Sequence, residues 1–458
     1  MTPLHLVVLA AGKGTRMKSR LPKVLHSAAG LPLIEHVLRT AGRMSPASIV
    51  IVVGHQADAV RAALQARTDI TFVLQERQLG TGHALLQTEA ALAGASGIVI
   101  LLSGDVPLLR AETLQRLVDH HRDTGAAATV LTAVAPDPAG YGRIERDGGR
   151  ITGIVEDKDA SPAQRAIKEI NSGIYAFDIA PLFGALRQIG SANRQGEYYL
   201  PDLVGIFRDR GLGVETVTLD DPEEILGVNS RKELAQVTQS LRRIRNEELM
   251  DAGVTLVDPA TAYIGPDVTI GPDTIIHPNV HLEGRSSIGE GCEIQCGVRI
   301  VDSTVADEVS INSYCVIRNS RIERGADLGP FTHLRPESHV GEQAHVGAFV
   351  ELKKTRMGRG AKAGHLAYLG DAVIGEQVNV GAGVITVNYD GRKKHQTTVE
   401  DGAFIGSDSQ LIAPVTVGKG AYVAAGSSIT EPVPPGALAI GRGKQVNKEG
   451  WVEKKNKR

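Results

Sequence analysis

Residues 264–276 read Ile-Gly-Pro-Asp-Val-Thr-Ile-Gly-Pro-Asp-Thr-Ile-Ile, so that an isoleucine followed by glycine recurs after six residues. The same six-residue spacing of aliphatic side chains continues in three runs, Ile264–Ile300, Val316–Leu352 and Ile405–Ile429. A hexapeptide repeat of this kind is typical of a parallel β-helix, in which each repeat forms one side of a prism and the coils stack on one another. The second half of the chain is therefore predicted to be a left-handed parallel β-helix.

The repeat is interrupted in a way that predicts where the coil departs from regularity. Shifts in phase near residues 301–315, 353–357 and 370–374 indicate inserted or deleted residues. The longest interruption, residues 386–400, contains a polar stretch at 388–395 without aliphatic spacing. We expect this stretch to be a loop that leaves the coil.

The first half of the chain has a different pattern of apolar residues. Short aliphatic runs at 4–10, 49–54, 71–75 and 98–103 are predicted strands, and the stretches 31–44, 57–66 and 83–93 are predicted helices. Alternating strands and helices with nearly continuous apolar strands favour a parallel sheet that is covered on both faces. Residues 1–229 are thus predicted to form a Rossmann-like α/β domain with a mixed, mainly parallel sheet.

A helix is predicted between the two halves of the chain. Ser230 and Glu233 form a capping-box pattern, and aliphatic residues follow at helical spacing. The predicted organisation is a domain at 1–229, a linker helix at 230–250 and a β-helix domain with its tail at 251–458.

Composition excludes several classes of protein. The 458 residues include 50 Lys plus Arg and 52 Asp plus Glu, so no global basic field supports nucleic-acid binding. Three cysteines are too few for a disulfide framework, which favours a reducing compartment. No apolar run is long enough to span a membrane. We expect a soluble cytoplasmic protein that neither binds nucleic acid nor inserts into a membrane.

A glycine-rich turn follows the first predicted strand. Residues 9–17 contain Gly12 and Gly14. Two cationic side chains accompany this turn: Arg16 lies within it and Lys23 lies six residues after its end. Exposed backbone N–H groups in such a turn bind phosphates, and cations stabilise the charge that develops when a triphosphate reacts. The dinucleotide fingerprint and the Walker pattern both fail here, so the turn alone does not identify the nucleotide.

Further polar residues follow later strands of the same domain. Gln75 precedes a second backbone-exposing turn at 79–84, which is suited to reading the edge of a base. Asp105 follows the fourth predicted strand, where a carboxylate is well placed to hold Mg²⁺ beside phosphates. Polar groups also cluster at 141–143, 156–158 and 170–173.

In the β-helix, two cations and a histidine interrupt the repeat. Arg335 and Lys353 are 18 residues apart, which is one full turn of a three-sided coil, so they are predicted to stack as a phosphate site. His365 lies near them in sequence, and a neutral imidazole can remove the proton of an ammonium nucleophile.

The glycine turn with its downstream Pro22-Lys23 resembles that of the sugar-1-phosphate nucleotidyltransferases. With the hexapeptide domain, nearly the whole chain resembles the bacterial bifunctional N-acetylglucosamine-1-phosphate uridyltransferases and glucosamine-1-phosphate acetyltransferases, which make a precursor of peptidoglycan and lipopolysaccharide. The resemblance implies Mg²⁺ on Asp105 and Asn229. Ser103 stands where some relatives carry an aromatic residue. The implied UTP and UDP-N-acetylglucosamine residues are Leu9, Ala10, Ala11, Gly12, Arg16, Lys23, Gln75, Gly80, Thr81, Ser103, Gly104, Asp105, Gly142, Glu156, Asn171 and Asn229.

For the β-helix the resemblance implies a second reaction, acetyl transfer from acetyl-CoA with His365 as the general base. Glucosamine-1-phosphate would bind to Arg335, Lys353, Tyr368 and Asn379. Acetyl-CoA would bind to Ala382, Asn388, Tyr389, Ser407, Ala425 and Arg442. Family members build this site from more than one subunit, so a homotrimer is expected.

Two other interpretations stay open at this point. The chain could be a sugar-1-phosphate nucleotidyltransferase whose β-helix serves only to trimerise it, although such a coil would not need Arg335, Lys353 and His365. Both activities could also act on another base or sugar, such as thymidylyl and glucose-type substrates, because the base-reading turn is permissive.

Overall fold

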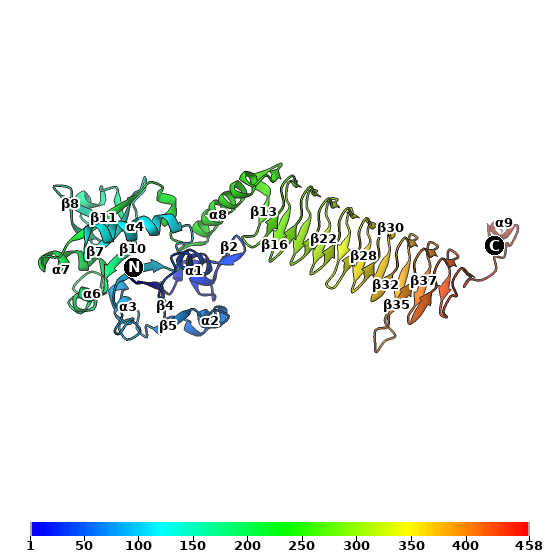
Figure 1. Ribbon diagram of the computed structural model, residues 1–458, viewed down its shortest axis with the longest axis horizontal. Coiled ribbons are helices and arrows are strands. Elements are labelled where there is room, and N and C mark those ends of the chain that lie inside the picture. Colours follow the sequence, from blue (N-terminus) through cyan, green and yellow to red (C-terminus); the bar gives the residue numbers. More distant parts are fainter. Residues whose placement is uncertain (1, 457–458) are drawn as a thin grey trace. The chain divides into compact units, whose positions relative to one another are not determined.

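Contacts within the chain divide the computed structural model, which describes residues 2–456, between Leu241 and Arg242. The first unit is an α/β domain and the second is a stack of parallel β-strands (Figure 1). The predicted fold class, an α/β domain followed by a left-handed β-helix of hexapeptide repeats, is confirmed. The functional partition of the chain at residues 229 and 251 stays a prediction.

The sheet of the first unit has the strand order β11-β7-β10-β6-β1-β4-β5. Only β10 in this path runs antiparallel, to both β6 and β7, so the sheet is mixed and mainly parallel as predicted. The strands are apolar on both faces because helices cover both sides. They are β1 (Leu4–Ala10), β4 (Ser48–Val53), β5 (Ile70–Leu74), β6 (Ile98–Ser103), β7 (Ala128–Val134), β10 (Glu169–Asp178) and β11 (Val214–Leu219).

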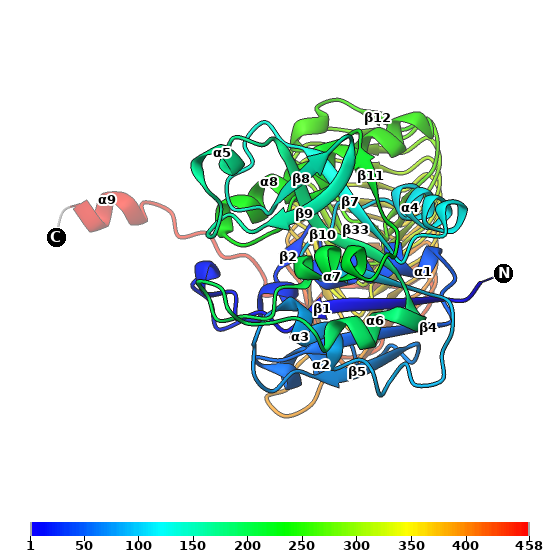
Figure 2. The ribbon, with the colours of Figure 1, turned by 90° about the vertical axis from the view of Figure 1, so that its left-hand side faces the viewer.

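Helices lie on the two faces of this sheet (Figure 2). One apolar layer is formed with α1 (Leu33–Arg43), α2 (Ala57–Ala63) and α4 (Ala111–Thr124), and the other with α3 (Thr81–Leu86), α6 (Ile179–Leu186) and α7 (Leu203–Asp209). The helix expected over 83–93 is wrong in extent, since α3 ends at Leu86. Beyond it the Thr88 hydroxyl donates to the Leu85 carbonyl at 2.7 Å, a local bond that competes with helical pairing.

Smaller elements complete this unit. They are the hairpins β2 (Ser27–Ala28) with β3 (Leu31–Pro32) and β8 (Arg143–Asp147) with β9 (Arg150–Val155), the short helix α5 (Pro162–Arg165), and the 3₁₀ turns η1 (Thr15–Met17), η2 (Lys23–Leu25), η3 (Leu200–Asp202) and η4 (Pro222–Ile225).

The predicted helix between the two halves of the chain is α8 (Arg231–Asp251). At its start the Ser230 hydroxyl accepts from the Glu233 N–H at 3.3 Å, as in a capping box. The Glu233 carboxylate differs from the usual box, because it accepts from the N–H of Asn229 at 2.8 Å. Near its end the buried Asn246 amide donates to the carbonyls of Pro259 and Ala262 at 2.8 and 3.1 Å.

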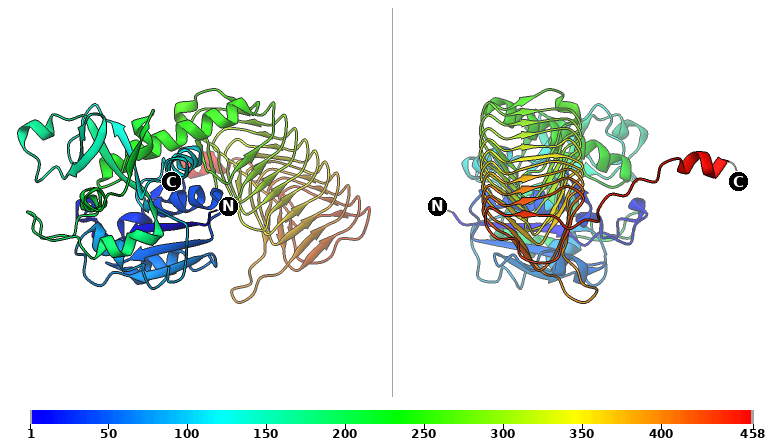
Figure 3. Two further views of the ribbon diagram at one scale, coloured as in Figure 1. Left: turned by 60° about the vertical axis from the view of Figure 1, so that its left-hand side comes forward. Right: turned by 90° about the vertical axis from the view of Figure 1, so that its right-hand side faces the viewer.

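The second unit stacks its strands into three parallel sheets, here named faces 1, 2 and 3 (Figure 3). Face 1 comprises β12 (Thr255–Leu256), β15 (Ile275–Ile276), β18 (Glu293–Ile294), β21 (Ser310–Ile311), β24 (Asp327–Leu328), β27 (His345–Ala348), β30 (Lys362–His365), β33 (Asn379–Val380), β36 (Phe404–Ile405), β39 (Tyr422–Val423) and β41 (Leu438–Ala439). Face 2 comprises β13 (Tyr263–Ile264), β16 (His281–Glu283), β19 (Arg299–Val301), β22 (Val316–Arg318), β25 (His333–Leu334), β28 (Glu351–Lys353), β31 (Tyr368–Gly370), β34 (Ile385–Val387), β37 (Gln410–Ile412) and β40 (Ser428–Ile429).

Face 3 comprises β14 (Thr269–Ile270), β17 (Ser287–Ile288), β20 (Thr304–Val305), β23 (Arg321–Ile322), β26 (His339–Val340), β29 (Arg356–Met357), β32 (Ala372–Ile374), β35 (Thr397–Val399) and β38 (Val415–Val417). The turn η5 (Pro259–Thr261) precedes the coil, and α9 (Trp451–Asn456) follows it. Within residues 2–456, no helix combines the length and apolar character that crossing a membrane would need.

The interior of the prism is the row of aliphatic side chains that the repeat predicted. One correction concerns Val316, which is half-buried, whereas its neighbour Ile317 is fully buried in the interior. The reason is a corner shortened by one residue, so that Ile300 pairs with Ile317 after 17 residues and not 18. Similar shortening between faces 2 and 3 explains the other shifts in phase near 353–357 and 370–374.

The predicted loop leaves the prism at this same corner. Thr386 and Val399 bracket it as consecutive interior positions on faces 2 and 3. In the two preceding turns the corresponding step takes only five residues, from Leu352 to Met357 and from Leu369 to Ile374. The loop is the orange excursion from the stack in Figure 3.

Candidate functional site

A pocket of about 410 Å³ opens at the carboxyl ends of β1, β5 and β6. This edge of a parallel sheet is the usual ligand site of doubly wound folds. The first-strand turn, the second turn and the end of β6 all contribute to it. Its lining is Leu9, Ala10, Ala11, Gly12, Lys13, Lys23, Val24, Gln75, Gln78, Gly80, Thr81, Ala84, Ser103, Asp105 and Glu197.

The ammonium group of Lys23, which lines this pocket, lies between two side-chain oxygens. The Lys23 ammonium is ion-paired with one carboxylate oxygen of Asp105, and it also donates to the side-chain oxygen of Asn229 at 3.1 Å. The Ser103 hydroxyl donates to the other Asp105 oxygen at 2.7 Å and so fixes the carboxylate. Asp105 and Asn229, far apart in sequence, thus present oxygens to one positive charge.

The second turn is contacted by the side chain of Gln75, the residue that follows β5. The Gln75 amide donates to the Gly80 carbonyl at 3.1 Å and contacts the His83 ring nitrogen at 3.0 Å. Gly80 has a φ of +109°, and a Cβ there would lie 2.6 Å from the Tyr198 carbonyl oxygen. Only glycine fits this position, and Gly80 and Thr81 of the turn line the pocket.

Three further predicted residues lie at the hairpin of β8 and β9 and on β10. The Asn171 N–H donates to the Gly142 carbonyl at 2.9 Å, and the Asn171 side chain lies against Gly142. Glu156 follows β9 and is half-buried. Burial raises the pKa of Glu156, and so do the charges of Asp159, Asp202, Glu197 and Asp157. This cluster is suited to binding a ligand rich in hydroxyls.

In the β-helix, polar residues gather at the end of face 2. Arg335 and Lys353 each lie one residue beyond paired interior leucines, so they stack in successive turns as predicted. Arg335 pairs with Glu351 at 2.9 Å, and Lys353 pairs with Asp371 at 3.5 Å. Asn388 from the loop donates to the same Asp371 carboxylate. Tyr368 folds over Gly370, where a Cβ would meet its hydroxyl at 2.4 Å.

A second row follows the end of face 1. His365 is exposed, and its position corresponds in the next turns to Ala382, Ser407 and Ala425, because each lies two residues beyond a paired interior side chain. The Arg442 guanidinium reaches this row and donates to the Ala425 carbonyl at 2.7 Å. Small side chains in successive turns leave room for an extended ligand along the prism.

Comparison with known proteins gives the same picture along the whole chain. A family model described as a MobA-like NTP transferase domain matches residues 6–147, and one described as the GMPPB C-terminal domain matches residues 250–338. "Bifunctional protein GlmU" of Trichlorobacter lovleyi is 52% identical over 450 residues, or 98% of each chain. The proteins of that name from Shouchella clausii and from an Anaeromyxobacter species are 50% and 53% identical, over 99% of this chain and 100% and 93% of theirs.

The chain belongs to the GlmU family. Matches at about half identity over nearly full length cover both units, so they include the glycine turn and the β-helix rows alike. The GlmU relatives are named as bifunctional, which agrees with two clusters of polar residues that lie in different units.

Some of the predicted residues lie outside these clusters. Neither Arg16 nor Gly104 lines the 410 Å³ pocket: Arg16 is exposed on η1, and the Gly104 N–H donates to the Leu9 carbonyl at 2.9 Å. Among the described residues the His365 ring makes no hydrogen bond, and Asn379 lies on face 1, whereas Lys353 lies on face 2. The Tyr389 hydroxyl donates within the loop, to the Gly391 carbonyl at 2.7 Å.

Sequence reasoning missed several residues that the structure brings to the clusters. Glu197 and Gln78 line the first pocket, and Asp371 joins Lys353 to Asn388. Lys394 of the loop lies next to Lys353. The pKa of Lys394 is lowered by its side-chain hydrogen bond with Lys353 and by the repulsion between the two positive charges. Asp371 could have been predicted, because this carboxylate follows Lys353 by one turn of the coil. Glu197 could not, because it lies in a loop whose sequence has no periodic pattern.

Proposed function

We propose that this enzyme makes UDP-N-acetylglucosamine in two reactions, one in each unit. The β-helix transfers acetyl from acetyl-CoA to glucosamine-1-phosphate, and the α/β unit then joins N-acetylglucosamine-1-phosphate to uridylate from UTP. The observation that supports this most strongly is the position of the Lys23 ammonium between Asp105 and Asn229, at the pocket that the glycine-rich turn after β1 also lines.

In the uridyl transfer, the sugar phosphate oxygen attacks the α-phosphorus of UTP in line with the bond to the leaving pyrophosphate. The N–H groups of the turn at Leu9–Gly12 and the Lys23 ammonium hold the phosphates. Gln75, Gly80 and Thr81 bind the uridine, and Gly142, Glu156 and Asn171 bind the sugar. No covalent intermediate with the protein is needed, because positioning and charge stabilisation lower the barrier.

The oxygen donors fit a divalent cation, and we propose Mg²⁺. Asp105 and Asn229 already surround one positive charge, the ammonium of Lys23, so two oxygens converge where a cation is favourable. When bound there, Mg²⁺ would neutralise charge on the phosphates. Lys23 would then be released from the carboxylate to contact the phosphates itself.

In the acetyl transfer, His365 takes a proton from the 2-amino group of glucosamine-1-phosphate. The nitrogen then forms a bond to the acetyl carbon of acetyl-CoA, the tetrahedral intermediate collapses, and the thiolate of CoA leaves. Arg335 and Lys353 supply cations for the sugar phosphate, with Tyr368 and Asn379 as further contacts. The proposed acetyl-CoA residues are Ala382, Asn388, Tyr389, Ser407, Ala425 and Arg442.

A homotrimer is part of this proposal. The His365 ring lacks a partner among the described residues of its own chain, and an exposed apolar row runs along the corner between faces 1 and 2, the corner that follows His365 in its own turn. In that row Tyr314, Phe331 and Phe349 stack with ring centroids 5.3 and 5.1 Å apart. Exposed apolar rows of this kind are usually covered by another subunit. Sedimentation of the intact protein measures the number of subunits.

The two-reaction proposal is tested in one vessel. Purified protein, Mg²⁺, glucosamine-1-phosphate, acetyl-CoA and UTP are mixed, and free thiol and pyrophosphate are followed together. Pyrophosphate that lags behind thiol and depends on acetyl-CoA is the expected result. Pyrophosphate released only from supplied N-acetylglucosamine-1-phosphate, with no thiol, would leave the β-helix as a structural module.

Two variants separate the reactions. Asp105→Ala should lower uridyl transfer by about 100-fold or more while acetyl transfer persists, because the loss of charge stabilisation is confined to one unit. His365→Ala should do the converse. A loss of both activities in either variant would indicate misfolding, which circular dichroism distinguishes.

A further inference from the structure

One segment of the α/β unit contacts both halves of the proposed uridyl transfer site. Residues 193–200, here named the strap, comprise the last part of the connection from α6 to η3 and the first residue of η3, and they run between the second turn and the turn that carries Glu156. Glu197 of the strap also lines the nucleotide pocket. Neither the glycine turn nor the sugar-binding cluster requires such a segment.

The strap is fixed to the second turn by its backbone. The Tyr198 N–H donates to the Leu79 carbonyl at 2.8 Å, and the Tyr198 carbonyl accepts from the Gly82 N–H at 2.9 Å. The Leu200 N–H donates to the Thr81 hydroxyl at 3.2 Å. Two backbone hydrogen bonds and one bond to a side chain therefore join the strap to the turn, so that a displacement of the turn displaces the strap.

The strap is also fixed to the turn at 156–160, by side chains. The Tyr199 hydroxyl donates to the Asp159 carboxylate at 3.1 Å. Arg194 donates to the Lys158 carbonyl at 2.7 Å, and the Lys158 ammonium donates to the side-chain oxygen of Gln195. Glu156 is the first residue of this turn, and its carbonyl accepts the hydrogen bond from the Asp159 N–H at 2.9 Å that closes the turn.

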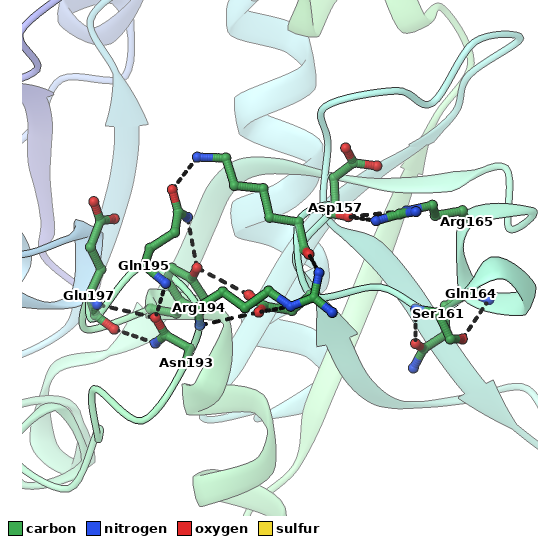
Figure 4. A network of polar contacts seen from close by, with 11 residues as sticks. Asp157, Ser161, Gln164, Arg165, Asn193, Arg194, Gln195 and Glu197 are labelled. Atoms are coloured by element: carbon green, nitrogen blue, oxygen red, sulfur yellow. Dashed lines mark hydrogen bonds and ion pairs between the residues drawn. The ribbon is translucent and has the colours of Figure 1, made fainter.

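The strap is stiff between its two attachments. The Asn193 side-chain oxygen accepts from the N–H groups of Gln195 and Glu197, both at 3.2 Å, and its amide donates to the Glu197 carbonyl at 2.5 Å (Figure 4). The Gln195 amide donates to the Tyr199 hydroxyl at 2.7 Å. Tyr199 is 8% exposed, and its hydroxyl is the hub that joins strap and turn.

We propose that the strap transmits nucleotide binding to the sugar subsite, with Tyr199 as the positioning residue at their junction. A nucleotide that orders the turn at 79–82 fixes the strap, and the strap fixes the turn that presents Glu156. Binding of nucleotide and of N-acetylglucosamine-1-phosphate is then mutually favourable, because each ligand orders part of what the other needs. This inference rests on the proposed function of the α/β unit.

The test is a coupling measurement and not a rate. Binding of N-acetylglucosamine-1-phosphate to the intact protein is measured by calorimetry with Mg²⁺, with and without α,β-methylene UTP, which cannot react. In the natural protein the nucleotide should tighten sugar phosphate binding by about 10-fold, within the usual range for coupled sites. Tyr199→Phe should reduce this factor at least about 3-fold, while binding of the nucleotide alone stays unchanged.

Matched variants make the outcome decisive. Ser161→Ala removes a hydrogen bond from the same region, where Ser161 caps α5 without contacting the strap (Figure 4), and should leave the coupling unchanged. If Tyr199→Phe does not fold, Gln195→Ala breaks the same junction from an exposed position. Full coupling retained in Tyr199→Phe, or no coupling in the natural protein, would overturn the inference. Failure of the natural protein to bind the nucleotide at all would instead contradict the proposed function.

Discussion

At the scale of single residues, Glu156 gives the α/β unit a pH dependence with a definite sign. Burial and four neighbouring carboxylates raise the pKa of this group, so it keeps its proton to a higher pH than a solvated glutamate. If the ionised form binds the sugar hydroxyls, uridyl transfer declines on acidification earlier than usual. Asp202→Asn removes one of those negative charges, and we expect the acid limb of kcat/KM for N-acetylglucosamine-1-phosphate to move to lower pH.

The control is Asp209→Asn, an exposed carboxylate at the end of α7 that is not among the groups acting on Glu156. Its pH profile should match that of the natural protein. An acid limb that stays in place in Asp202→Asn, or that moves equally in both variants, would contradict the electrostatic account of Glu156.

Residue identities were predictable from the sequence where the fold itself fixes them. Asp105 follows an aliphatic strand, and Lys353 follows an interior leucine, so topology alone brought each to its cluster. Asn229 and Glu156 were assigned through resemblance, because nothing in their local sequence sets them apart. Glu197 and Tyr199 were missed, since irregular loops gain their position from contacts distant in sequence, such as that of Tyr199 with Asp159.

At the scale of elements, the loop at 388–396 is the clearest departure from the repeat. It replaces a corner that needs only five residues in the preceding turns, and its Asn388 and Lys394 approach Asp371 and Lys353. Replacing the loop with an ordinary corner should leave the β-helix folded, because the interior aliphatic row is untouched. We expect acetyl transfer to fall about 100-fold or more through lost positioning, with uridyl transfer unchanged.

Thermal unfolding and the two separate assays measure these effects. Lys393→Ala is the matched control, since its side chain on the same loop takes part in none of those contacts. A loopless variant with normal acetyl transfer would show that the loop has no part in the site. Loss of both activities, with an early unfolding transition, would show that the corner cannot be shortened.

The period of the β-helix was visible in sequence because every interior position repeats one environment. The lengths of its corners could not be predicted in the same way. A corner that is shortened by one residue changes the sequence only by a shift in the phase of the repeat. For this reason Val316 was predicted as an interior residue in place of Ile317. The end of α3 was missed for a related reason, since the helical spacing of apolar residues continues beyond Leu86, where the chain forms hydrogen-bonded turns and not a regular helix.

At the scale of the whole molecule, the two clusters lie in different compact units, with no residue common to both. We therefore expect N-acetylglucosamine-1-phosphate to leave the β-helix, mix with the solution and rebind. The protein is given isotope-labelled acetyl-CoA, glucosamine-1-phosphate and UTP, together with an excess of unlabelled N-acetylglucosamine-1-phosphate. The label in UDP-N-acetylglucosamine should be diluted in proportion to the unlabelled pool, whereas the same mixture without the competitor yields fully labelled product. Label that resists dilution would mean that the intermediate passes between sites without release, and two independent clusters would then be an incomplete description of the enzyme.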